Sequence, residues 1–163
     1  MDAETAACVR SWDAVNPDLE RHDVYDDDAC AEFVRKHYPQ YAELYFEKLS
    51  RPVERADVFR YLVVHRYGGW YADIDTTALR PLNDLCGDLV VAKEFEHMLG
   101  GYQVLQYFFG ATPQHPFFVH QEPGMVHRRA AGTGVQLPCP DTGHGLGQRK
   151  AKTMRAVFTL AGK

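Results

Sequence analysis

Apolar residues recur at three- and four-residue spacing in three segments of the first half of the chain, and this spacing predicts three helices. A short polar lead precedes the first helix, which begins after the capping candidates Asp26–Asp28 and ends before Pro39. The second helix covers residues 41–49. The third begins at Pro52, a residue that favours a first helical turn, and ends before Gly68. Its apolar positions are Val53, Ala56, Phe59, Leu62, Val63 and Tyr67.

Strand-forming residues follow the third helix. The segment WYADI, residues 70–74, is rich in strand formers and comes directly after two glycines. The polar residues after it, together with Pro81, predict an irregular connection. Later segments are a strand at 88–95, a strand or helix at 101–111, a short element at 115–123 and a Gly- and Pro-rich loop after Gly124. Helices mixed with strands predict an α/β fold.

The bulk composition narrows the class of protein. A chain of 163 residues with 45% hydrophobic residues is long enough for one domain that buries roughly 70% of its unfolded surface. A net charge of -4 and the lack of a basic run argue against a nucleic-acid partner. The apolar runs are too short to cross a bilayer and no signal peptide opens the chain, so we expect a soluble protein.

Four cysteines lie far apart and form no CxxC pair, which gives a zinc site no local support. They are either buried free thiols or disulfide partners, for which three pairings are possible.

Asp73 and Asp75 are the first candidates for chemistry. Side chains two residues apart in a strand point to the same face, so both carboxylates would meet at the carboxyl end of the predicted strand. Open α/β sheets bind ligands at that end. Two hard oxygen ligands suit Mg²⁺ or Mn²⁺, which can in turn hold a diphosphate. A DxD pattern arises readily by chance, however, and Asp26 and Asp28 form another beside a helix start.

Asp57 and Arg60 stand three apart on the third helix, which is otherwise apolar and must be largely buried. They form either an internal ion pair between helix and sheet or a pair that reaches a polar ligand beside Asp73 and Asp75. For the ligand hypothesis, both pairs must lie on the same side of the sheet.

The segment RADVFRYLVVHRYGGWYADIDTTALRPL resembles the signature of glycosyltransferase family 32, the DXD-containing sugar transferases. Fungal Golgi mannosyltransferases and inositol phosphorylceramide mannosyltransferases belong to that family. The segment SWDAVNPDLERHDVYDDDACAEFVRKHYP resembles the family's SW…NP…WDD…FV…YP lead, and QYFFGATPQHPFF resembles its later segment ending in HPF. The resemblance runs from Ser11 to about Leu146.

This resemblance implies a GT-A fold, in which a Rossmann-like mixed sheet is flanked by helices. It also implies a nucleotide-sugar donor such as GDP-mannose or a UDP-hexose, a divalent cation, usually Mn²⁺, and transfer with retention of the anomeric configuration. Asp73 and Asp75 match the metal motif, and Asp73 also approaches the donor's ribose. The remaining donor-site and catalytic matches are Asp57, Arg60, Tyr71 and Gln106. For Tyr71, packing in the core is the alternative.

The sequence also departs from the family pattern. Nothing resembling the first strand, IPKIIHQ, precedes Ser11, and the chain ends in KAKTMRAVFTLAGK where relatives supply a late His and Trp at the metal. Gln106 stands where the mannosyltransferase relatives carry Asn, nine residues before the His-Pro pair. His144 stands where the family's TGPG-like turn has its proline. We therefore expect residues 1–163 to form a single, short GT-A-like domain that lacks the first strand and the carboxyl-terminal metal segment.

The function implied is a metal-dependent hexosyltransferase, with mannose as the leading sugar and a glycan or a glycolipid such as a sphingolipid as the acceptor. Peripheral membrane contact fits a lipid acceptor. Eukaryotic relatives work in the Golgi and bacterial ones in the cytoplasm. Two alternatives stay open: a non-catalytic remnant that binds a nucleotide or partner, and a haloacid-dehalogenase-like phosphatase with Asp73 as nucleophile.

Overall fold

The computed structural model describes residues 1–96, 102–119 and 155–159. The predicted Gly- and Pro-rich loop, His144 and most of the carboxyl-terminal segment lie outside these residues. The chain forms the helices α1 (Ala3–Val15), α2 (Asp27–His37), α3 (Pro52–Tyr67) and α4 (Pro116–Val119) and the strands β1 (Arg21–Tyr25), β2 (Gly69–Ala72), β3 (Leu89–Glu96), β4 (Tyr102–Ala111) and β5 (Arg155–Thr159). Short helical turns cover Pro39–Tyr41, Leu44–Lys48 and Leu82–Asp84.

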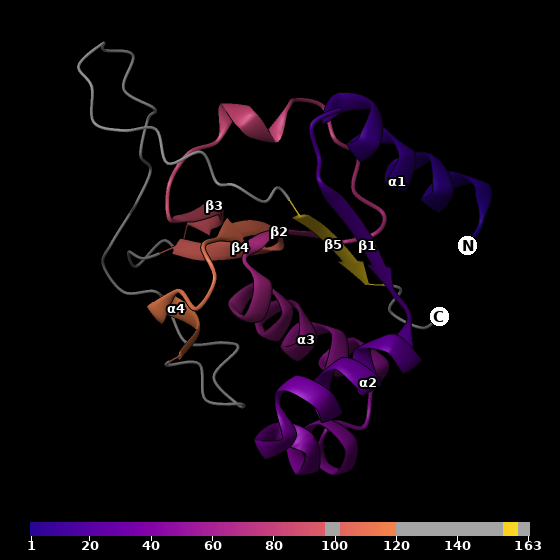
Figure 1. Cartoon of the computed structure of the whole chain (residues 1–163), viewed down its shortest axis with the longest axis vertical. Coiled ribbons are helices and arrows are strands. Elements are labelled where there is room, and N and C mark those ends of the chain that lie inside the picture. Colours follow the sequence, from indigo (N-terminus) through magenta and orange to yellow (C-terminus); the bar gives the residue numbers. More distant parts are fainter. Residues whose placement is uncertain (97–101, 120–154, 160–163) are drawn as a thin grey trace.

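The five strands form one mixed sheet in the order β1-β5-β2-β4-β3. Strand β5 runs parallel to both β1 and β2, whereas β4 runs antiparallel to both β2 and β3. Helix α1 lies over one face of the sheet, and α2 and α3 lie over the other (Figure 1). The predicted α/β class, with a mixed sheet flanked by helices, is confirmed.

Each face of the sheet has its own core, because side chains in β2 alternate between the faces. Tyr71 points toward α3 and is fully buried there. Trp70 and Ala72 point the other way, toward Trp12 of α1. On the α3 side the core includes Cys30, Phe33, Val34, Phe59, Val63, Val64 and Phe109.

Local signals explain where α2 and α3 begin and end. The Asp26 carboxylate caps α2 by accepting a hydrogen bond from the Ala29 backbone N–H at 2.8 Å. Helix α3 begins at Pro52 and ends at Tyr67, and its C-cap is Gly68, whose φ of 67° favours glycine. A Cβ at Gly68 would also lie 2.7 Å from the backbone nitrogen of Pro113, which precedes α4. The chain before α4 passes so close to Gly68 that only glycine fits here.

The structure departs from the sequence interpretation at three places. The polar lead before Asp26 contains strand β1, and helix α1 precedes that lead; the sequence interpretation assigned no element to either. The helical stretch predicted at 41–49 is helical but not a regular α-helix: it contains a π-helical turn over Leu44–Lys48, closed by the Leu49 N–H donating to the Leu44 carbonyl. Strand β2 ends at Ala72 rather than at Ile74, because a turn begins at the next residue.

Two further observations bear on the composition. Cys8 and Cys30 are free thiols, whereas Cys86 is disulfide-bonded. Among the described residues, no helix has the length and apolar character that a membrane span requires.

Candidate functional site

Asp73 directly follows strand β2, and its side chain lies on the α3 side of the sheet. The Asp73 N–H donates to the Tyr107 carbonyl of β4 at 2.9 Å, which extends the β2–β4 ladder by one residue beyond Ala72. Asp73 therefore has the same orientation as Tyr71, two residues earlier. The Tyr71 hydroxyl donates to Asp73 Oδ1 at 2.7 Å, so a buried core residue also orients the carboxylate.

Arg60 lies at the centre of a charged cluster under this strand end, and only 7% of the residue is exposed. Its Nη2 atom lies 2.7 Å from Asp57 Oδ1 and 3.7 Å from Asp73 Oδ1. Its Nη1 atom donates to the Gln106 carbonyl at 3.0 Å. The guanidinium carbon lies 5.1 Å from the centre of the Tyr71 ring, within the range of a cation–π contact. Residues of helix α3, of strand β4 and of the end of β2 thus hold the positively charged Arg60 side chain between the Asp57 and Asp73 carboxylates.

The cluster is closed on the arginine side and open on the carboxylate side. The Asp57 and Asp73 side chains are 32% and 34% exposed, respectively. Arg60 Nε is buried and has no hydrogen-bond partner within the part of the chain that the structure describes. An unsatisfied buried donor costs about 1–3 kcal/mol. The buried Nε is closed to a ligand, whereas the part-exposed carboxylates are open to one and can accept its hydrogen bonds.

Asp75 does not join this cluster through strand geometry. The Asp73 carbonyl accepts from the Thr76 N–H at 3.0 Å and from the Thr76 hydroxyl at 2.6 Å, so residues 73–76 form a tight turn with Asp75 at its exposed corner. The expectation that a strand would align both carboxylates on one face is therefore wrong. Among the described residues, no group of three or more His, Cys, Asp or Glu side chains could hold a metal ion.

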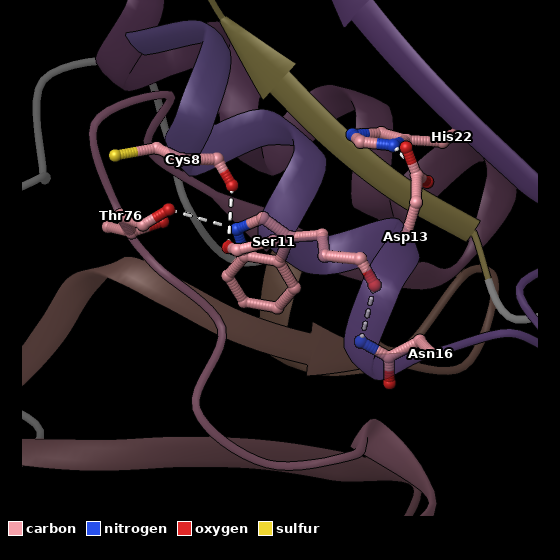
Figure 2. Close-up of polar contacts among 7 residues, drawn as sticks. Cys8, Ser11, Asp13, Asn16, His22 and Thr76 are labelled. Atoms are coloured by element: carbon pink, nitrogen blue, oxygen red, sulfur yellow. Dashed lines mark hydrogen bonds and ion pairs between the residues drawn. The ribbon is translucent and has the colours of Figure 1, made fainter. Parts of the chain in front are cut away.

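Side chains of helix α1 form hydrogen bonds with the end of this turn and the residues after it (Figure 2). Trp12 Nε1 donates to the Thr76 carbonyl at 3.0 Å. The Ser11 hydroxyl accepts from the Ala78 N–H at 2.9 Å and donates to the Cys8 carbonyl at 2.6 Å. The Cys8 thiol lies 3.5 Å from the Asp75 carbonyl. The backbone after Asp73 is thus held by side chains from a helix about 65 residues away.

Asn16, at the end of α1, completes this attachment. Its side-chain amide donates from Nδ2 to the Trp12 carbonyl at 2.9 Å, and Oδ1 accepts from the Leu82 N–H at 2.6 Å. Asn16 is 3% exposed. The sequence interpretation used Ser11, Trp12 and Asn16 only as matches to a family lead. It missed their role beside the turn, because no local pattern links positions so far apart.

The predicted site residues therefore fall into three groups. The side chains of Asp57, Arg60 and Asp73 lie together, and Tyr71 contacts two of them from the core. Gln106 reaches the cluster through its backbone carbonyl. Asp75 lies at the exposed corner of the adjoining turn.

The donor set is compatible with Mg²⁺ or Mn²⁺. Asp73 and Asp75 supply hard oxygen atoms, and Asp73 is oriented by the Tyr71 hydroxyl. Mg²⁺ is commonly held by one or two carboxylates together with substrate phosphates, rather than by a cage of protein ligands. A third protein ligand is therefore not required for a cation that arrives with a diphosphate.

Comparison with known proteins agrees with the motif. The family described as "glycosyltransferase sugar-binding region containing DXD motif" matches residues 2–92. Mannosyl phosphorylinositol ceramide synthase SUR1 of Saccharomyces cerevisiae is 30% identical over 113 residues, which cover 69% of this chain and 28% of that protein. Inositol phosphoceramide mannosyltransferase 2 of Schizosaccharomyces pombe is 31% identical over 104 residues, 64% of this chain and 28% of that protein.

A third relative is the initiation-specific alpha-1,6-mannosyltransferase of Candida albicans, which is 32% identical over 77 residues, 46% of this chain and 20% of that protein. The chain thus spans less than a third of the length of these three curated relatives. No solved structure matches it.

Proposed function

Since the chain belongs to the glycosyltransferase family whose sugar-binding region contains the DXD motif, we propose that it transfers a hexose from a nucleotide-sugar donor to a hydroxyl group of a glycan or glycolipid. Mannose is the leading sugar, because the three relatives named above are a mannosyl phosphorylinositol ceramide synthase and two mannosyltransferases. Retention of the anomeric configuration is part of the proposal.

The observation that carries the proposal is the buried Arg60 between two part-exposed carboxylates. A sugar presents hydroxyl groups that both donate and accept hydrogen bonds. The carboxylates of Asp57 and Asp73 can accept from these hydroxyls, and Arg60 keeps the two negative charges at a fixed separation. Because Arg60 is held by Gln106 and Tyr71 before any ligand arrives, little reorganisation is needed on binding.

Asp73 and Asp75 would hold the divalent cation, Mn²⁺ or Mg²⁺. When bound, the cation neutralises charge on the departing nucleoside diphosphate. The protein's own contribution is to fix the backbone of the turn through Trp12 and Ser11, and to orient the Asp73 carboxylate through the Tyr71 hydroxyl.

The structure bears differently on the other two hypotheses. A non-catalytic chain would keep the same binding cluster and differ only in turnover. A phosphatase would need Asp73 as a free nucleophile, whereas Asp73 Oδ1 accepts a hydrogen bond from Tyr71 and faces Arg60. The family match also includes this motif within residues 2–92.

Titration calorimetry with GDP-mannose, UDP-glucose, UDP-galactose and UDP-GlcNAc, each with and without Mn²⁺, tests the proposal. We expect one donor to bind in a Mn²⁺-dependent manner and to be hydrolysed slowly. Asp57→Asn and Asp73→Asn should each weaken binding about tenfold or more, which corresponds to about 1.4 kcal/mol. Asp84→Asn, at an exposed acidic residue after the turn, is the matched control and should bind normally.

Turnover separates the enzyme from a binding remnant. Mn²⁺-dependent hydrolysis that is lost in Asp75→Ala supports the transferase, whereas binding without any turnover supports the remnant. Failure of all four donors to bind, with or without Mn²⁺, refutes the proposed function.

A further inference from the structure

We propose that Tyr107 is a sugar-binding residue of this site, whose aromatic ring packs against the hexose ring of the bound donor. The inference rests on the proposed function and assigns to the sugar an apolar contact that the charged cluster cannot provide.

Strand pairing places Tyr107 beside Asp73. In the antiparallel β2–β4 pair, Tyr71 is opposite Phe109 and Ala72 is opposite Phe108. The hydrogen bond from the Asp73 N–H to the Tyr107 carbonyl continues this register by one residue. Directly opposed residues in an antiparallel pair have their side chains on the same face, with Cβ atoms about 4.5–5.5 Å apart.

The face in question is the one that carries the charged cluster. Tyr71 and Phe109 point into the core on the α3 side, with their rings 5.5 Å apart. Asp73 follows β2 and continues the alternation from Tyr71. Strand β4 is irregular against β3 between Phe109 and Val104, but the Asp73–Tyr107 hydrogen bond keeps Tyr107 in register with β2, so the two residues lie on that same side. Asp73 is within 3.7 Å of Arg60 there. Tyr107 thus flanks the Asp57–Arg60–Asp73 cluster.

Tyr107 is unusually exposed for an aromatic residue in β4. It is 44% exposed, whereas Leu105 and Phe109, two positions before and after it, are 9% and 2% exposed. Among the described residues, it is the only aromatic in the group of exposed large hydrophobic side chains. The Tyr107 ring is therefore not part of the core, and the surface of the ring is open to a ligand next to the carboxylates.

A hexopyranose combines both kinds of surface that meet at this position. Its hydroxyl groups form hydrogen bonds around the rim, and the C–H groups on its face are apolar. Carboxylates and a guanidinium suit the rim, while an aromatic ring removes the apolar face from water. A tyrosine does this at small entropic cost, because its ring has only two side-chain torsions.

The test compares a nucleotide sugar with the same nucleotide lacking the sugar. Titration calorimetry in Mn²⁺ measures the affinity for GDP-mannose and for GDP, or for the corresponding UDP pair if the donor panel selects uridine. In Tyr107→Ala we expect about tenfold weaker binding of the nucleotide sugar and an unchanged affinity for the nucleoside diphosphate. Tyr107→Phe should retain the affinity for the nucleotide sugar within about twofold, because the ring is kept.

Leu79→Ala is the control, since Leu79 is 86% exposed and follows the turn rather than facing the cluster. It should leave both affinities unchanged. Two unchanged affinities in Tyr107→Ala overturn the inference alone. An equal loss of both affinities also overturns it alone, because Tyr107 would then act on the nucleotide or on the fold. Failure of the unaltered protein to bind any nucleotide sugar refutes the proposed function, and the inference with it.

Discussion

Replacing Asn16 by alanine tests whether α1 holds the segment after the Asp73 turn. The Asn16 side chain makes two buried hydrogen bonds, one to the Trp12 carbonyl and one from the Leu82 N–H. The Trp12 carbonyl would keep the Asn16 backbone N–H, which donates to it at 3.0 Å. The Leu82 N–H would lose the acceptor in its 2.6 Å bond, and Leu82 is only 2% exposed.

The magnitude follows from that one orphaned donor. Leaving a buried N–H unsatisfied costs about 1–3 kcal/mol, so we expect a loss of about 2 kcal/mol in the free energy of unfolding. For a chain of this size, such a loss lowers Tm by about 4–8 °C. Loss of this bond would also allow the backbone between Asp75 and Leu82 to shift. The Mn²⁺-dependent affinity for the donor should therefore fall in the same variant.

Urea unfolding, followed by circular dichroism, measures the change as a shift in midpoint at constant slope. Asn83→Ala is the control, because Asn83 is an exposed asparagine in the same region and its replacement should be neutral. A loss below about 0.5 kcal/mol in Asn16→Ala, no larger than an ordinary surface substitution, would show that the side chain does not secure Leu82 and would refute this reasoning.

Two further predictions concern packing and pH. Gly110→Ala should destabilise the protein by about 1–3 kcal/mol in urea unfolding, because a Cβ at this position would lie 2.7 Å from Trp70 Cδ2 within a closely packed core. A change in unfolding free energy within about 0.3 kcal/mol of zero would contradict this packing. Burial, and then the charge of Arg66, lower the pKa of His65 from its ordinary value of 6.5, while its Nδ1 lies 2.6 Å from the Tyr38 hydroxyl. The unfolded chain therefore binds a proton at higher pH than the folded one, so the stability present above about pH 6.5 is lost as the pH falls through the folded pKa. In urea midpoints measured from pH 7 to pH 5, His65→Gln should decline less steeply than the unaltered protein, and equal slopes would exclude His65 as a source of the decline.

Local signals were sufficient for part of the fold. Pro52 and Gly68 predicted both ends of α3, because a proline suits the first helical turn and a glycine can adopt positive φ at the end. Asp26 predicted the start of α2 by the same logic, since its carboxylate reaches a backbone N–H only three residues away. The strand formers of β2 were also visible locally, although the final residue of the strand was not.

The site was predictable as a set of residues but not as an arrangement. The sequence indicated Asp57, Arg60 and Asp73, and the structure brings these three together. The strand argument for pairing Asp73 with Asp75 was wrong, because the hydrogen bonds of Thr76 to the Asp73 carbonyl turn the chain after Ala72. Propensity alone does not reveal that turn, which α1 also holds from the opposite face of the sheet.

By itself, the sequence determined the features that depend on neighbours within a few residues: the helix caps, the helical spacing of apolar side chains and the motif that marks the family. Only the tertiary structure decided which groups meet across longer separations, such as Arg60 with the Gln106 carbonyl, 46 residues apart, and Trp12 with the Thr76 carbonyl, 64 residues apart. The physical reason is range: capping and propensity act along the backbone over one or two turns, whereas these contacts form only after the sheet and its two cores bring distant segments together.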